Sequence, residues 1–173
     1  NEETTGINYR VIGIDYQAFT RCSNLTSVTI PDSVTSIGDS AFSNCTNLTS
    51  VTIPDSVTSI GNHVFSNCEN LTNINIPDSV TSIGQGTFYN CDKLISITIP
   101  DSVTSIGNSA FSCSGLTSVV IPEGVTSIGS KAFYRCFNLT NISIPSSVTS
   151  IGNDAFNNCT SLTSVTIPEG VTS

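Results

Sequence analysis

Methionine and tryptophan are absent from the 173 residues, and the chain has one histidine and only 5 basic residues against 13 acidic ones. The formal net charge is therefore −8, with a sequence pI of about 4.2. A surface of this sign repels nucleic-acid phosphates and anionic membranes, so we expect neither as a partner. Long apolar runs are also lacking, because Thr, Ser or Asp interrupts each of them, and we expect no membrane insertion.

The chain begins at Asn1 and stops within the phrase Val171-Thr172-Ser173, which continues into Ile and Gly in earlier copies. We therefore expect a processed or excerpted chain, with any signal peptide before it and further repeats after it. The composition, 38% hydrophobic and 10% charged residues, is far from that of a disordered chain, so we expect it to fold.

Three residue types recur with one period. Successive prolines are 23, 23, 23, 22, 23 and 23 residues apart, and the 7 cysteines show the same series. Phenylalanine recurs with them, at Phe19, Phe42, Phe65, Phe88, Phe111, Phe133 and Phe156. We place the residue missing from the short copy between Phe111 and Cys113. A period of this length is typical of leucine-rich-repeat solenoids.

Each copy predicts two short strands and one helical turn. In residues 48–54 Val and Ile alternate with Thr, which indicates a strand that is ended by Pro54. Residues 57–60 predict a second extended piece, closed by Gly61 in a turn with positive φ. Phe65 and Cys68 are three residues apart, as on one face of a helical turn.

The residue before each repeated leucine predicts the turn into the next strand. We expect a left-handed backbone there, at Asn24, Asn47, Asn70 and Asn138, with Gly115 in the same role.

The predicted fold class is α/β, a leucine-rich-repeat solenoid of about seven stacked 23-residue coils. We expect a parallel β-sheet on one face, and a short strand plus the helical turn on the other. The whole chain, 1–173, is predicted to be one domain. Residues 1–8 lie outside the pattern, and the repeats are 9–23, 24–46, 47–69, 70–92, 93–114, 115–137, 138–160 and a partial 161–173.

The phrases IPDSVTSIGDSAFSNC (30–45) and SLTSVTIPEGVTS (161–173) resemble the BspA-like subfamily of leucine-rich repeats, which occur on bacterial and protist cell surfaces. The resemblance covers residues 9–173. It implies an extracellular or cell-surface location and a role in adhesion or ligand binding, with no shared catalytic residues to carry over.

The cysteines predict a column of buried free thiols. Equivalent cysteines of stacked coils would lie about 4.8 Å apart, beyond the usual Cβ separation in a disulfide, and their number is odd. With one cysteine in each coil we expect no thiolate metal site and no cofactor. His63 has no catalytic partner at a fixed spacing and is predicted to be an exposed bystander, so we expect no enzyme.

Acidic residues follow most of the predicted strands. A solvated edge that keeps the rod soluble is one interpretation, and Ca²⁺ binding is the other. The column consists of Asp32, Asp55, Asp78, Asp101, Glu123, Ser146 and Glu169.

Two surfaces are candidate partner sites. The first is the outward position of the strands, which is either kept featureless for stacking or suited to a repetitive target such as a glycan; it comprises Thr29, Thr52, Asn75, Thr98, Val120, Ser143 and Thr166. The second is the helical-turn side, where aromatic and basic residues gather, at Tyr89, Tyr134, Arg135 and Phe137.

Asn-x-Ser/Thr sequons occur seven times, at Asn24, Asn44, Asn47, Asn70, Asn138, Asn141 and Asn158. They are candidate glycosylation sites in a eukaryotic secretory host, or by-products of the Asn and Thr that the turn and strand require.

The leading function is a non-catalytic adhesion or recognition segment of a larger surface protein, which binds a protein or glycan on another cell surface. The alternative is a structural protein that associates end to end with further copies of itself into fibrils.

Overall fold

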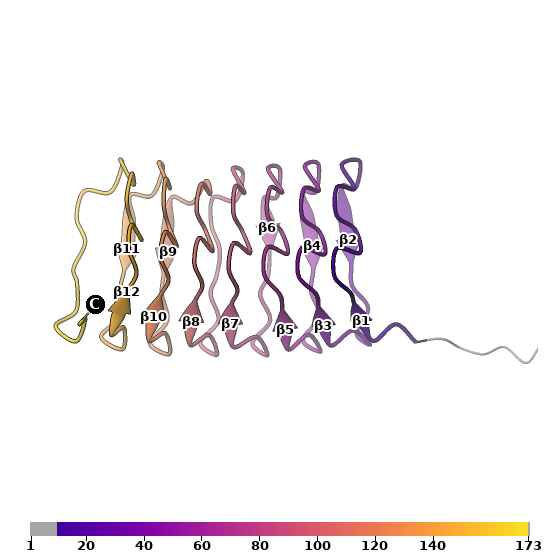
Figure 1. The fold of residues 1–173 in the computed structure, drawn as a ribbon, viewed down its shortest axis with the longest axis horizontal. Helices are drawn as coiled ribbons and strands as arrows, with labels where there is room; N and C mark the ends of the chain where they lie inside the picture. Colours follow the sequence, from indigo (N-terminus) through magenta and orange to yellow (C-terminus); the bar gives the residue numbers. More distant parts are fainter. Residues whose placement is uncertain (1–9, 173) are drawn as a thin grey trace, which may run out of the picture.

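The computed structural model describes residues 10–172, which wind into one elongated solenoid (Figure 1). The predicted non-repeating segment 1–8 lies outside the described residues, as do Tyr9 and Ser173.

Each turn of the solenoid, called a coil here, contributes up to two short strands, which lie in two rows (Figure 1). The row that we call the front row lies farther from the viewer in Figure 1 and contains β2 (Ser27–Thr29), β4 (Ser50–Thr52), β6 (Asn73–Ile74), β9 (Ser118–Val120) and β11 (Asn141–Ser143). The back row contains β1 (Gly13–Ile14), β3 (Ser36–Ile37), β5 (Ser59–Ile60), β7 (Ser82–Ile83), β8 (Ser105–Ile106), β10 (Ser127–Ile128) and β12 (Ser150–Ile151). About six complete turns therefore separate β1 from β12.

Paired strands are parallel and align equivalent residues of successive coils, such as Val28 with Val51 and Ile37 with Ile60. Each row is divided in two: the front row into β2-β4-β6 and β9-β11, and the back row into β1-β3-β5 and β7-β8-β10-β12. The front row is interrupted between β6 and β9, because residues 94–100, which occupy that place in the row, form no strand. The predicted sheet is present in pieces, and the second extended piece of each copy forms a row of its own.

The core consists of columns of equivalent side chains along the solenoid. The rings of Phe42, Phe65, Phe88, Phe111 and Phe133 are at most 1% exposed. Neighbouring rings stack with centroids 5.2–5.8 Å apart and planes within 11° of each other. Columns of Leu, Val and Ile surround them. The predicted burial of the Phe column is confirmed for these coils, whereas Phe19 in the first coil is 42% exposed.

The predicted helical turn is wrong, and with it the α/β class, because no helix occurs in residues 10–172. The backbone of residues 40–45 shows the reason. Amides of Ser40, Phe42 and Asn44 donate to carbonyls of the next coil at 2.8–3.0 Å, whereas the amides between them close local turns. An α-helix directs every amide along its own axis. Ser40 and Asn44 have φ of 58° and 60°, and these left-handed residues rotate alternate amides toward the next coil.

The predicted left-handed positions are also wrong. Positive φ occurs not at the Asn before each leucine, nor at Gly115 or Gly61, but at two positions of the turn segment, the equivalents of Ser40 and Asn44. Gly61 is needed for another reason, since a Cβ there would lie 2.7 Å from the amide nitrogen of Asp39 in the preceding coil. The glycine therefore permits close approach of two backbones.

Candidate functional site

The repeat is interrupted on the turn side by a change of register. In the other coils the third residue after the column Phe is a cysteine, which is buried in all of them except the first, as in Phe65 and Cys68. After Phe111 this place is held by Ser114, which is 4% exposed, and its hydroxyl lies 3.4 Å from the Cys136 sulfur. Cys113 instead has φ of 58° and is half-buried. The missing residue therefore falls after Ser114, not between Phe111 and Cys113 as predicted.

Gly115 makes the shortened turn possible. Its amide donates to the Cys91 carbonyl at 3.1 Å, and a Cβ at this residue would collide with the Asp92 carbonyl oxygen. The turn is thus drawn in against the preceding coil, with no side chain where other coils carry one. This absence leaves a surface hollow of about 380 Å³.

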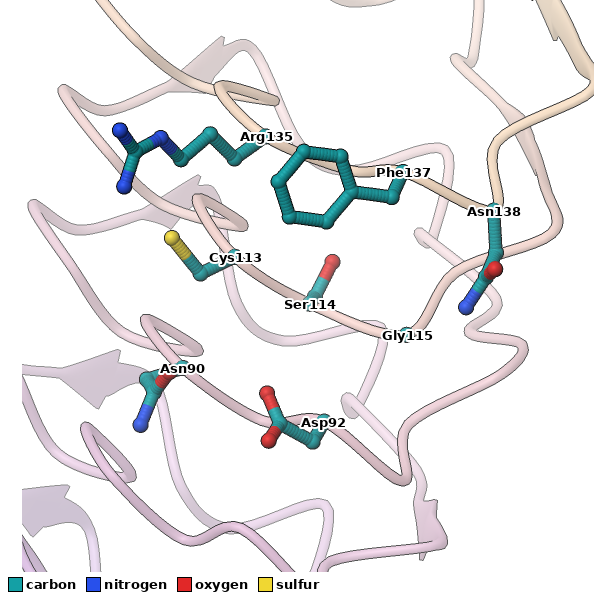
Figure 2. A pocket seen from close by; sticks show the side chains of 8 residues that line it. All are labelled: Asn90, Asp92, Cys113, Ser114, Gly115, Arg135, Phe137 and Asn138. Atoms are coloured by element: carbon teal, nitrogen blue, oxygen red, sulfur yellow. The ribbon is translucent and has the colours of Figure 1, made fainter. Parts of the chain in front are cut away.

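Three successive coils line the hollow (Figure 2). The coil below contributes Asn90 and Asp92, the shortened coil forms the floor with Cys113, Ser114 and Gly115, and the coil above contributes Arg135, Phe137 and Asn138. Asp92 and Phe137 are both two residues beyond a left-handed residue, Asn90 and Arg135 respectively. They are therefore equivalent positions two coils apart, or about 10 Å at a strand spacing of about 4.8 Å.

Two of the four predicted turn-side residues line the hollow, and the other two do not. Arg135 and Phe137 both line the hollow, and Phe137 is 52% exposed. The Tyr134 ring lies beside them, with the Arg135 guanidinium 5.2 Å and the Lys131 ammonium 5.7 Å from its centroid. Tyr89 is at the surface of the coil that carries Asn90, but does not line the hollow.

The front-row candidates form a separate, polar surface. Thr29, Thr52, Asn75, Thr98, Ser143 and Thr166 are all exposed, and the equivalent Val120 is 71% exposed. None of them lies on the turn side, and the pattern of small polar residues offers no Arg or aromatic anchor.

The cysteines are free throughout, as predicted, but not all are buried. Cys45, Cys68, Cys91, Cys136 and Cys159 are buried, whereas Cys22 is exposed and Cys113 is half-buried. The buried thiols donate to carbonyls of the preceding coil, for example Cys68 to Phe42 at 3.2 Å. Burial raises the pKa of Cys68 from 9.0 to about 12, so the thiol stays protonated near neutral pH.

The remaining candidates are His63 and the column of acidic residues. His63 is half-buried rather than exposed, at a left-handed position with φ of 55°. The acidic column after the front row is exposed from Asp32 to Glu169. Within residues 10–172 no three His, Cys, Asp or Glu side chains are arranged to hold a metal ion.

The sequon asparagines differ in accessibility. Asn24, Asn47, Asn138, Asn141 and Asn158 are exposed, whereas Asn44 and Asn70 are half-buried, with amides that donate to Ser43 Oγ and the Thr46 carbonyl, both at 2.8 Å. The sequon threonines are structural as well. Thr49 and Thr72 donate their hydroxyls to carbonyls of the preceding coil at 2.9 and 3.1 Å.

Sequence reasoning missed Asn90, Asp92, Cys113 and Ser114 as neighbours of Arg135. The spacing Phe111 to Ser114, matched against Phe65 to Cys68, was the available signal, because it identifies which residue enters the core.

The part of the chain that the structure describes also has no helix long and apolar enough to cross a membrane.

Comparison with known proteins gives a consistent result. The BspA type leucine rich repeat region, with 6 copies, matches residues 12–137 and 126–173. A leucine-rich repeat protein from Bacteroides ovatus is 40% identical with a TM-score of 0.82; the match covers 86% of this chain and 41% of that one. A T. pallidum leucine rich repeat protein is 34% identical with a TM-score of 0.83, over 90% of this chain and 73% of that one. The pneumococcal vaccine antigen PcpA, 18% identical with a TM-score of 0.58 over 93% and 57% of the two chains, shares the fold.

No match was found among curated proteins. The family model spans nearly all of the described residues, and the T. pallidum protein supports the same conclusion at 34% identity. The repeat register, the stacked Phe rings and these comparisons agree, and the chain belongs to the BspA-type leucine-rich repeat family.

Proposed function

We propose that the chain is a non-catalytic recognition segment of a surface protein, and that it binds an extracellular partner through its turn side. The family resemblance supports the extracellular location. The observation that carries the binding surface is the hollow with exposed Phe137 and Arg135 on one wall. Aromatic and Arg side chains are enriched among the residues that dominate binding energy.

The turn side is preferred to the front row for a physical reason. A partner gains most by burying aromatic rings and by pairing Arg with an acceptor, and both groups are available at the hollow. The front row presents small hydroxyl and amide side chains, which are already well hydrated. Its one exposed large apolar residue in the strands is Val120 of β9.

The test is saturable binding of the purified chain to immobilised extracellular-matrix proteins and to a glycan array. We expect Phe137→Ala with Arg135→Ala to abolish binding, because both anchors are removed. Val120→Ala is the matched control, since it truncates an exposed apolar side chain on the other surface. Equal binding by the double variant and the control would contradict the proposal. Long fibrils in electron micrographs would instead favour end-to-end assembly.

A further inference from the structure

We propose that the hollow binds a saccharide that carries a carboxylate, with Arg135 holding the carboxylate and Phe137 packing against the sugar ring. This inference rests on the proposed function, because it names the ligand class of the same surface.

The first observation is a pair of cations without acidic partners. The chain has 13 acidic residues, yet within residues 10–172 neither Lys131 nor Arg135 pairs with any of them. Both side chains lie against the Tyr134 ring instead. Stacking on an aromatic ring orders a guanidinium while leaving its N–H donors available. The planar fork of Arg135 is suited to donate two parallel hydrogen bonds to a carboxylate.

The second observation is an exposed aromatic ring above a recess. Phe137 is 52% exposed, whereas Phe133 in the same coil is fully buried. Figure 2 shows the Phe137 ring above Ser114 and next to the base of the Arg135 side chain, whose guanidinium extends away from the ring, toward the part of the hollow at Cys113. Sugar rings present apolar C–H faces, and aromatic rings offer a large apolar area to such faces. The hollow, at about 380 Å³, lies toward the small end of ligand pockets, which span about 300–1,000 Å³.

The third observation is the mixed character of the polar groups. Asn90 and Asn138 each offer an amide donor and acceptor, and Asp92 offers only acceptors. Hydroxyl groups can satisfy all three side chains. A peptide with several carboxylates would be repelled by Asp92 and by the net charge of −8. One carboxylate combined with several hydroxyls matches one guanidinium, one carboxylate and two amides.

The experiment uses immobilised oligosaccharides in matched pairs. One member of each pair contains a uronic acid, and the other contains the corresponding neutral hexose in its place. We expect at least one uronic-acid member to bind saturably. Its neutral twin should bind with an affinity lower by about tenfold or more, because a charge-assisted hydrogen bond is lost. Arg135→Gln should weaken binding of the acid by about tenfold or more and leave the neutral twin unchanged.

Two further variants separate the site from general charge effects. Arg21→Gln removes one positive charge at the equivalent left-handed position of the first coil, where φ is 63°, and should bind as the unmodified chain does. Inserting one Thr between Ser114 and Gly115 restores the 23-residue spacing and should abolish binding by occupying the hollow, although all the lining side chains are retained. Circular dichroism confirms that each variant folds.

The outcomes distinguish this inference from the proposed function. If no pair shows a preference for the acid, or if Arg135→Gln binds as tightly as Arg21→Gln, the saccharide inference is overturned. If a protein ligand then binds in a Phe137-dependent manner without competition from uronic acids, the recognition function stands alone. If neither sugars nor proteins bind through Phe137 and Arg135, both proposals fail.

Discussion

Truncation of Phe65 to alanine should remove about 5 kcal/mol from the free energy of unfolding. Phe65 is fully buried and stacks between Phe42 and Phe88, with centroids 5.7 and 5.8 Å apart. Phe→Ala substitutions in cores cost about 3–5 kcal/mol, and each stacked pair contributes about 0.5–1.5 kcal/mol beyond burial. The upper end applies because neighbours on both sides lose contact and the backbone hydrogen bonds between coils prevent their collapse into the cavity.

Urea unfolding followed by far-ultraviolet circular dichroism measures the effect. With a denaturant dependence of about 2–3 kcal/mol per M, the midpoint should fall by about 2 M. Because coils contact only their neighbours, the loss should also broaden the transition by uncoupling the two halves of the solenoid.

Phe137→Ala is the matched control for this measurement. Its ring is 52% exposed and outside the Phe column, so the free energy of unfolding should change by less than about 0.5 kcal/mol. If Phe65→Ala were no more destabilising than Phe137→Ala, the stacked aromatic column could not be what holds the coils together.

Two further predictions concern thiol ionisation and backbone approach. Burial raises the pKa of Cys68 from 9.0 to about 12, so the thiol ionises at lower pH in the unfolded chain than in the folded one. The contribution of this thiol to the free energy of unfolding is therefore fully present below pH 9 and is lost between pH 9 and 12, by about 1.4 kcal/mol per pH unit. Urea titrations at several pH values should show that the free energy of unfolding falls less steeply with pH for Cys68→Ser than for the unmodified chain. Equal slopes for the two proteins would refute this. Gly61→Ala places a Cβ 2.7 Å from the Asp39 amide nitrogen and should cost about 1–3 kcal/mol. A Cβ at Gly13 would lie 3.1 Å from Ser36 Oγ, the end of a side chain, and an ordinary 3.8 Å from the Ser36 carbonyl oxygen. Equal melting temperatures for the alanine variants of both glycines would contradict the close-approach account.

The repeat and its inward columns could be predicted from the sequence because period and chemistry coincide. Phe42 and Leu48 recur in one register with the other apolar residues, so a stacked coil buries them all. The free thiols followed from the spacing between coils. These features depend on residue type, which a sequence shows directly.

The turn segments could not be predicted in the same way. Left-handed backbone is usually signalled by Gly or Asn, yet here it occurs at Gln17, Arg21, Ser40 and Lys131, because hydrogen bonds to the next coil determine it. The helical turn predicted from the spacing of Phe65 and Cys68 fails for this reason.

The hollow was missed because it results from a side chain that is absent. Aligning the copies by cysteine placed Cys113 in the core column and concealed the shift that puts Ser114 there. Arg135 and Phe137 could be singled out by composition, whereas Asp92 and Asn90 become their neighbours only after the coils are stacked.

The most direct test of the stacked coil and its shifted register is the labelling of native thiols, with the modified cysteines identified by mass spectrometry. The structure predicts rapid reaction at Cys22, slower reaction at Cys113, and protection of the other five thiols until the chain is unfolded. Rapid labelling of all seven would contradict the stacking of the coils, and protection of Cys113 together with the five would contradict the register that creates the hollow.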